Sequence, residues 1–342
     1  MSFKIGIIGG TGLEDPQILE NARQLHVETP YGPPSDVIEG TINSIPCVLL
    51  SRHGKKHTVS PTDINYRANI WTLKKLGVSV IITSSASGSL KEELKPGHIV
   101  FLDSFIDSSV GRAALRLTVG RRFKSCHGSR LFCIHNNLAI RMRRRVKRHH
   151  LELRAAGTTK RMQTFYDGEE GHPKGICHIP AHPLFNEKIR MVLIQCAKEL
   201  GIEHHPNGTS VCIEGPRYST RAESELYRSW GASLVNMTVC PEVILAKELG
   251  IPYATIALVT DYDCWKDTHE IVSVDLVDRI LRENAHKTKV LFIKAVSELN
   301  AIRNDLLKEI DEAKLFLDDC ASLVKKCFQF NMVKIFALDG DS

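Results

Sequence analysis

Small and polar residues follow four apolar segments of the chain, at the point where each segment ends. Ligands of open α/β sheets bind beyond the carboxyl ends of the strands, so these groups are expected to converge. They offer hydroxyls, a guanidinium, an imidazole and backbone N–H groups near glycine, which are the donors that suit a phosphate. The four sequences are Gly9-Gly10-Thr11-Gly12, Ser51-Arg52-His53-Gly54, Thr83-Ser84-Ser85-Ala86-Ser87-Gly88 and Asn236-Met237-Thr238.

The first glycine cluster argues against a dinucleotide cofactor. Gly10-Thr11-Gly12 begins the G-x-G-x-x-G fingerprint, but Asp15 stands where the third glycine should be. A carboxylate there would face the pyrophosphate, so a nicotinamide oxidoreductase is disfavoured. His53 and His57 are four residues apart, but the residues between them lack the glutamate of a zinc-protease motif. No metal site is predicted.

Two further segments that end apolar runs could carry chemistry. Asp261 and Asp263 flank a tyrosine after the apolar run 252–259, which suits an acid/base site or, alternatively, an Asx-type turn or helix cap. Tyr218 lies in the segment 214–219 and could stack on a flat ligand or simply pack at a rim. Beside a phosphate site, the chemical interpretation of the segment with Asp261 and Asp263 is favoured.

The elements that must position these residues read as alternating strands and helices. This order indicates an α/β fold with one central mixed sheet covered by helices on both faces. Thr220 and Glu223 fit a capping box, and Pro241 suits a first helical turn. The predicted strands are 3–8, 46–51, 78–84, 98–102, 209–213, 233–236 and 252–259, and the predicted helices are 66–75, 187–200, 222–229, 241–249 and 273–299.

Composition limits the class of protein. The chain has 342 residues, of which 43% are hydrophobic, enough for a sizeable core, and no apolar run is long enough for a membrane span. Its ten cysteines form no C-x-x-C pair, which is typical of reduced thiols in the cytoplasm. Met1 to Lys4 run straight into a predicted strand, so no signal peptide is expected.

The positive charge of the chain is local. Residues 108–157 hold 13 Lys and Arg against a single acid, Glu152, and without them the net charge of +6 becomes −6. This aperiodic block resembles translated non-coding sequence, such as a retained intron or a gene-model error. The alternatives are a tolerated surface insertion and a nucleic-acid-binding arm, although only Phe123 and Phe132 could stack on bases there.

Taken together, the motifs resemble the methylthioadenosine phosphorylases, in the trimeric branch of the purine nucleoside phosphorylase family. The resemblance covers about residues 4–107 and 158–298. It rests on the ordered matches KIGIIGGTGLED, SRHGKKH, NYRANIW, GSLKEELKPG, FYDG, EGPRYSTRAES, VNMT, PEVILAKELGI and TDYDCW.

The resemblance implies a reaction and a role for each residue. Phosphate would attack C1′ of methylthioadenosine and release adenine and 5-methylthioribose 1-phosphate. Asn236 and Met237 would contact the substrate, with Met237 against the ribose, and Tyr218 would stack on adenine. The phosphate ligands implied are Thr11, Arg52, His53, Ser85, Ala86 and Thr238.

The leaving group and the specificity also follow from the resemblance. Asp261 would protonate or hydrogen-bond N7 of adenine, and Asp263 would hold the amino group or orient Asp261. Asp261 and Ser219 indicate a 6-amino base, because the related 6-oxopurine phosphorylases carry asparagine and glutamate at these positions. His178 and Val274 would lie near the 5′ end of the sugar.

The resemblance further implies a homotrimer that needs no metal or organic cofactor, located in the cytoplasm and also in the nucleus. The expected phosphorylase domain is 1–298, interrupted by the insertion 108–157. A helical tail, 299–342, does not match the family. The alternatives kept open are a 6-oxopurine nucleoside phosphorylase and a nucleic-acid-binding protein.

Overall fold

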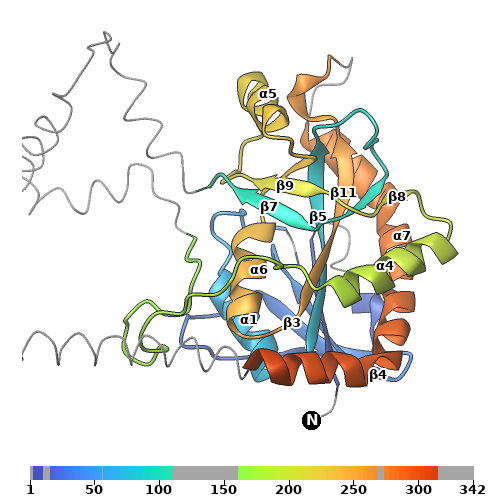
Figure 1. Cartoon of the computed structure of the whole chain (residues 1–342). Coiled ribbons are helices and arrows are strands. Elements are labelled where there is room, and N and C mark those ends of the chain that lie inside the picture. The colour runs from blue at the N-terminus through green and yellow to red at the C-terminus, as the bar shows by residue number, and fades with distance from the viewer. Residues whose placement is uncertain (1–2, 11–15, 56, 110–160, 268–272, 315–342) are drawn as a thin grey trace, which may run out of the picture.

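The computed structural model describes residues 3–10, 16–55, 57–109, 161–267 and 273–314 (Figure 1). Within these ranges the strands form one mixed sheet of order β2-β3-β4-β1-β5-β10-β9-β7, while β11 pairs with β5 and β6, and β6 also pairs with β8. The strands are β1 Ile5–Gly9, β2 Glu20–Leu25, β3 Asp36–Ile42, β4 Ile45–Ser51, β5 Val80–Ser89, β6 Ile99–Phe101, β7 Ser104–Asp107, β8 His204–His205, β9 Thr209–Cys212, β10 Leu234–Asn236 and β11 Tyr253–Asp261.

Strand β5 organises the sheet because it pairs with three neighbours. Its first half runs parallel to β1, its length runs parallel to β11, and its last residues pair antiparallel with β10. Figure 1 shows β5 and β11 running upright through the middle of the molecule. The ends of β5, β10 and β11 therefore meet.

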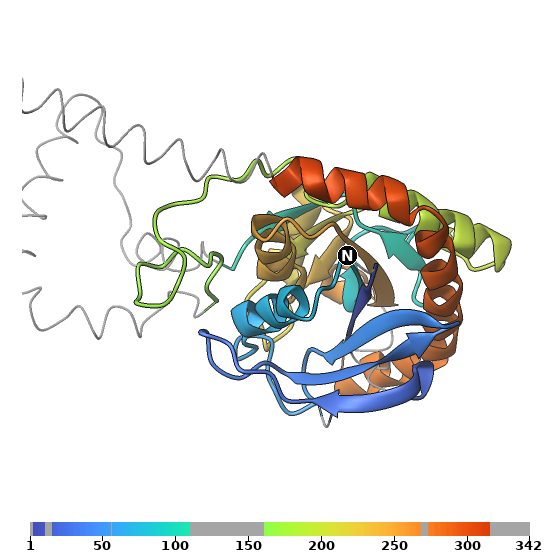
Figure 2. The same ribbon diagram turned by 90° about the horizontal axis from the view of Figure 1, so that it is seen from below.

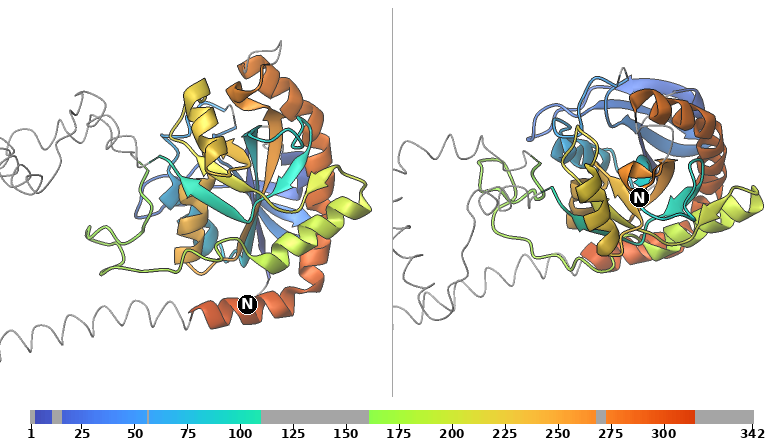
Figure 3. Two further views of the ribbon diagram at one scale, coloured as in Figure 1. Left: turned by 45° about the horizontal axis from the view of Figure 1, so that its top comes forward. Right: turned by 90° about the horizontal axis from the view of Figure 1, so that it is seen from above.

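Helices cover both faces of the sheet, and alternate strand residues face opposite ways. Ile5 and Ile7 of β1 pack in a core with α4 and α7, whereas Ile8 packs in a second core with α1 and α6. Views from below and from above show the same layering around the strands (Figures 2 and 3). The named helices are α1 Tyr66–Lys75, α4 Glu187–Glu199, α5 Arg221–Ser229, α6 Val239–Glu248 and α7 Val274–Ala301, with short 3-10 turns η1 Pro16–Ile18 and η2 Asp263–Trp265.

The predicted α/β class, the mixed sheet and the five predicted helices are confirmed. The predicted capping box is present: the Thr220 hydroxyl accepts from the Glu223 N–H, and the Glu223 carboxylate accepts from the Thr220 N–H. Four strands were missed: β2, β3, β7 and β8. Strand β2, with the sequence ENARQL, is polar and exposed at the sheet edge, so only its pairing with β3 marks it as a strand.

The beginning of the predicted tail is part of the packed structure. Residues 303–314 are helical, and Leu306 and Ile310 are buried in the same core as α4 and α7. The Asn186 amide, which caps α4, donates to Glu309 of this helix at 2.7 Å. The remainder of the predicted tail, 315–342, lies outside the described residues.

Asp107 and Gln163, which flank the Arg-rich segment in the sequence, lie side by side. Asp107, at the end of β7, accepts from the Gln163 amide at 2.6 Å and from the Ser109 hydroxyl at 2.6 Å. Residues 110–160 lie outside the described residues, and with them all of the predicted insertion 108–157 except Ser108 and Ser109. The chain thus leaves and re-enters the fold at one point.

In the part of the chain that the structure describes, no helix is both long enough and apolar enough to cross a bilayer.

Joining Asp107 directly to Thr158 is expected to leave the fold intact. The deletion shortens the loop between Asp107 and Gln163 about tenfold, which reduces the entropy of loop closure by about 2 kcal/mol. The residues that remain between Asp107 and Gln163 can still span the distance between them, because the two side chains are hydrogen-bonded to each other. We expect a melting temperature at least equal to that of the full chain. A lower value, or an unfolded product, would show that residues 108–157 are an integrated part of the protein.

Candidate active site

One cavity of about 480 Å³ collects most of the predicted site residues at the carboxyl ends of β4, β5, β10 and β11. Predicted residues that line it are Arg52, His53, Ser85, Ala86, Tyr218, Ser219, Asn236, Met237, Thr238, Asp261 and Asp263. The same strand ends therefore bring together the groups expected to hold phosphate and those expected to hold a base.

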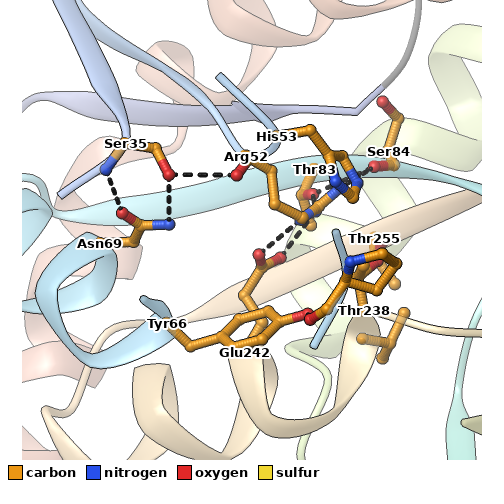
Figure 4. A network of polar contacts seen from close by, with 12 residues as sticks. Ser35, Arg52, His53, Tyr66, Asn69, Thr83, Ser84, Thr238, Glu242 and Thr255 are labelled. Atoms are coloured by element: carbon orange, nitrogen blue, oxygen red, sulfur yellow. Dashed lines mark hydrogen bonds and ion pairs between the residues drawn. The ribbon is translucent and has the colours of Figure 1, made fainter. Parts of the chain in front are cut away.

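Arg52 lies at the phosphate end and is held by a buried network (Figure 4). Its guanidinium makes a two-pronged ion pair with Glu242 of α6, at 2.7 Å from Nε and 2.8 Å from Nη2. Nη2 also donates to the Thr83 hydroxyl at 2.6 Å, and Nη1 donates to the Ser84 carbonyl at 3.0 Å. Both charged side chains are at most 2% exposed. The fork is therefore fixed before any ligand arrives.

The ion pair decides the charge of Arg52. Burial by itself would lower the pKa of Arg52, but the charge and hydrogen bonds of Glu242 outweigh burial and raise it. Tyr253 of β11 donates its hydroxyl to Glu242 Oε1 at 2.7 Å, and burial keeps the pKa of Tyr253 well above its usual value. Arg52 thus stays charged and Tyr253 stays neutral.

His53 is neutral in the unliganded site. Burial, followed by the charge of Arg52, lowers the pKa of His53 to about 4. Its Nδ1 lies 2.8 Å from the Val59 carbonyl, which can only accept, so Nδ1 carries the proton. The ring of His57 lies against it, with centroids 4.3 Å apart.

Neutral donors surround this fork. The Ser85 hydroxyl is buried without a hydrogen-bond partner, and the Thr238 hydroxyl leaves the start of α6 uncapped. Asn236 fixes their relative positions: its Oδ1 accepts from the Thr238 and Val239 N–H groups, and its Nδ2 donates to the Ala86 carbonyl at 3.3 Å. The hydroxyls remain available to a ligand.

Asp261 closes the other end of the cavity and is buried. Burial raises its pKa, while the Thr260 hydroxyl at 2.6 Å and the Asp263 N–H at 2.7 Å act in the opposite direction. Both oxygens already accept one hydrogen bond. Asp261 is thus a carboxyl whose protonated form is favoured by its surroundings and whose position is fixed.

Asp263 also has a pKa raised by burial. The hydroxyls of Ser224 and Ser219 lie close enough to favour its ionised form, but neither reaches it with hydrogen-bond geometry. Asp263 Oδ2 and the Ser219 Oγ atom are buried without a partner. Both atoms are available to a polar ligand at this end of the cavity.

A close approach of two strands requires glycine at position 88. A Cβ built on Gly88 would lie 3.1 Å from Asp261 Oδ1 and 3.4 Å from Asp263 Cβ. The register of β11 against β5 shifts between Val259 and Asp261, which brings Asp261 opposite Gly88. The missing side chain thus makes room for the two carboxylates.

Arg161 supports the middle of the cavity and was missed in the sequence as a functional residue. Its buried guanidinium donates to the carbonyls of Met237 and Glu214. Met237 directly follows β10, and Glu214 begins the segment that carries Tyr218. The Tyr218 side chain is 37% exposed. The Arg-rich residues just before Arg161 hide it in the sequence.

Three predicted residues are not among those lining the cavity. Thr11 lies outside the described residues, as does the side chain of Val274, the first residue of α7. His178 is exposed. Their assigned roles stay predictions.

Other contributors to the site were missed. Glu242 could have been suspected, because it is an acid in the otherwise apolar helical stretch PEVILA. Asp275, Val277 and Leu281 of α7 also line the cavity. They follow the predicted residue Val274 along the chain, but were not themselves predicted.

The hydrogen bond from Thr260 to Asp261 generates a stability prediction. The pKa of Asp261 is higher in the folded protein than in the unfolded chain, where it is about 4. Ionisation of Asp261 therefore lowers the free energy of unfolding as the pH rises above that value. Thr260→Val removes a donor to the carboxylate, so the variant should lose a further 1.5–3 kcal/mol or so once Asp261 is ionised, and less in acid. Denaturant unfolding at several pH values measures this difference.

Thr255→Val is the matched control, because Thr255 is a buried threonine of the same strand whose hydroxyl contacts only the Ile256 carbonyl, at 3.5 Å. Its stability loss should not depend on pH. A loss that is equally independent of pH in both variants would contradict the arrangement around Asp261.

Known proteins match this chain along most of its length. The family model described as "Phosphorylase superfamily" matches residues 4–297. S-methyl-5′-thioadenosine phosphorylase of Caenorhabditis briggsae is 48% identical over 300 residues, which cover 87% of this chain and 88% of that protein. The protein of the same name from Caenorhabditis elegans is 47% identical and covers 91% of this chain and 92% of its own.

Solved structures give the same result. Methylthioadenosine phosphorylase from Schistosoma mansoni in complex with adenine superimposes with a TM-score of 0.76 at 34% identity, covering 94% of this chain and 99% of that one. A variant of the Schistosoma mansoni adenosine/methylthioadenosine phosphorylase in complex with methylthioadenosine gives a TM-score of 0.75 at 34% identity. The chain belongs to the phosphorylase superfamily and, within it, to the S-methyl-5′-thioadenosine phosphorylases.

Proposed function

We propose that this enzyme cleaves S-methyl-5′-thioadenosine with inorganic phosphate, giving adenine and 5-methylthioribose 1-phosphate. It is thereby a pentosyltransferase of purine and methionine salvage. The relatives that bear this name and the structural neighbours with methylthioadenosine or adenine bound support the proposal.

One observation in the site carries the proposal. Four buried polar groups without a partner, Ser85, Ser87, Ser219 and Asp263, line the same cavity. Buried polar groups are nearly always hydrogen-bonded in folded proteins, so a polar ligand is the expected partner. Ser85 lies among the phosphate donors, and Ser219 and Asp263 lie with Asp261, as a phosphate and a purine would require.

The phosphate half of the reaction needs positioning more than proton transfer. Phosphate is an anion already, so Arg52, Ser85 and Thr238, with neutral His53 and the backbone at Ala86, need only hold it against C1′. Thr11 completes this set in the proposal. Holding both reactants in one cavity converts a bimolecular attack into a step within the complex.

The base half needs a proton donor. As the C1′–N9 bond breaks, its electron pair moves into the purine, and Asp261 gives its proton to N7 and becomes a carboxylate. The raised pKa of Asp261 suits this role, because a carboxyl must stay protonated near neutral pH to donate. Asp263 binds the 6-amino group or orients Asp261.

The remaining predicted residues set specificity. Asp261 and Ser219 favour a 6-amino base over a 6-oxopurine, in agreement with the names of the relatives. Met237 and Asn236 face the ribose, Tyr218 stacks on adenine, and Val274 lies at the methylthio group. The 6-oxopurine and nucleic-acid alternatives have no support from the relatives.

The proposal includes a homotrimer, located in the cytoplasm and the nucleus, that needs no metal or organic cofactor. His178 is exposed and does not line the cavity of its own chain, so its role at the 5′ end of the sugar requires a neighbouring subunit. Met162 and Ile176, in the same stretch of chain, are large apolar side chains exposed to 45% and 50%. We expect them at the subunit contact. Residues 1–298 form the catalytic domain in this proposal, and 108–157 are not needed for it.

The decisive assay measures adenine release from methylthioadenosine with and without inorganic phosphate. Release should depend on phosphate and persist after dialysis against a chelator. Full turnover without phosphate, or loss of activity on chelation, would contradict the proposal.

Asp261→Asn should reduce methylthioadenosine turnover by about 10²-fold or more, because the general acid is lost. Its relative preference should shift toward 6-oxopurines, measured as the ratio of adenosine-type to inosine turnover. Asp267→Asn is the control, since Asp267 is 85% exposed and pairs with Arg221 at the surface. An unchanged rate and ratio in Asp261→Asn would remove Asp261 from the mechanism.

A further inference from the structure

The guanidinium of Arg52 has almost no free donors. A guanidinium has five N–H groups. Glu242 accepts from Nε and Nη2, Thr83 accepts from Nη2, and the Ser84 carbonyl accepts from Nη1. One N–H of Nη1 remains. Nη1 would lie 3.1 Å from a Cβ built on Gly10, which lines the cavity, so this side of Arg52 faces the cavity across a glycine.

The charge of Arg52 is matched at the phosphate end of the cavity. Glu242 cancels the charge of Arg52 at hydrogen-bond distance, and His53 is neutral. Ser85 and Thr238, which also line this end, are uncharged. An incoming anion therefore meets hydroxyls, backbone N–H groups and one N–H of an arginine whose charge is already matched.

We infer that Glu242 is a positioning residue that sets the affinity for phosphate. It does not line the cavity and acts through Arg52: it fixes the guanidinium and competes with the incoming anion for its charge. This inference rests on the proposed function. It adds that the site is restrained from binding phosphate tightly.

The restraint has a chemical reason. The nucleophile and the sugar phosphate product are both anions that occupy the same donors. A buried arginine without a counter-ion would hold both strongly, because charge interactions are strong where water is excluded. Slow release of the product would then limit turnover. The Glu242 carboxylate keeps the Arg52 guanidinium in place and lets the anion leave.

Glu242→Gln tests the inference with little change in shape. The amide oxygen can still accept from Arg52 Nε, and the amide N–H₂ group can donate to the Tyr253 oxygen, which then reverses its role. The bond to Arg52 Nη2 is lost, and the charge on Arg52 has no counter-ion until an anion binds.

The matched control is Glu248→Gln. Glu248 is a second buried glutamate of α6, but it accepts from the Thr164 hydroxyl and the Phe165 N–H instead of an arginine. Inorganic phosphate is titrated into each full-length protein by calorimetry, without nucleoside, in a low-salt buffer free of other oxyanions. The rise in melting temperature with phosphate is measured in parallel.

Glu242→Gln should bind phosphate about tenfold more tightly than the unchanged protein, and Glu248→Gln should bind it equally well. The melting temperature of Glu242→Gln should be lower than that of the unchanged protein without phosphate, and it should rise more steeply as phosphate is added. A purely structural role would lower the melting temperature in both variants and leave phosphate affinity alone. Unchanged or weaker phosphate binding by Glu242→Gln would overturn the inference.

Poor folding of Glu242→Gln is also informative. If the variant folds when refolded in phosphate and not in its absence, the anion has replaced the missing counter-ion, which supports the inference. If phosphate gives no rescue beyond that seen for Glu248→Gln, the inference is wrong. Failure of the proposed function would look different, because the unchanged protein itself would then bind no phosphate and release no adenine.

Discussion

The structure around the cavity depends on the buried ion pair between Arg52 and Glu242. Two buried charges destabilise a fold unless each is matched and hydrogen-bonded. Here Thr83, Ser84 and Tyr253 complete the network. The pair joins the end of β4 to the start of α6, and its partners join both to β5 and β11. A different arrangement of these four elements would leave the charge of Arg52 or Glu242 unpaired in the apolar interior.

The consequence is a site whose two ends differ in chemistry although they share strands. Beyond β4 and β5, a matched arginine and neutral hydroxyls suit an anion that must bind and leave. Beyond β11, burial favours the protonated form of Asp261, which suits donation to a leaving base. The register shift of β11 opposite Gly88 makes room for the carboxylates at that end. Strand β5 connects the two ends and so fixes the distance between the proposed phosphate site and Asp261.

The residues that flank the Arg-rich segment belong to the packed fold. Asp107 and Gln163 are in contact, so the fold closes before the segment begins and after it ends. Arg161, two residues before Gln163, reaches inward to the Met237 and Glu214 carbonyls. A residue beside the segment thus supports the cavity.

The sequence by itself determined the α/β class, the five named helices and eleven of the residues that line the cavity. Those features are local: apolar periodicity, a capping box at Thr220, and polar groups placed directly after apolar runs. The polar edge strand β2 and short strands such as β8 could not be found, because pairing with a neighbour, not their own residues, defines them.

Only the tertiary structure decided what Arg52 does with its donors. Glu242 lies 190 positions away along the chain, and burial of both side chains follows from the packing of α6 against the sheet. The same holds for the neutral state of His53 and the raised pKa of Asp261. Sequence shows which groups can ionise, but the free energy of ionisation depends on exclusion of water and on nearby charges, which exist only once the chain has folded.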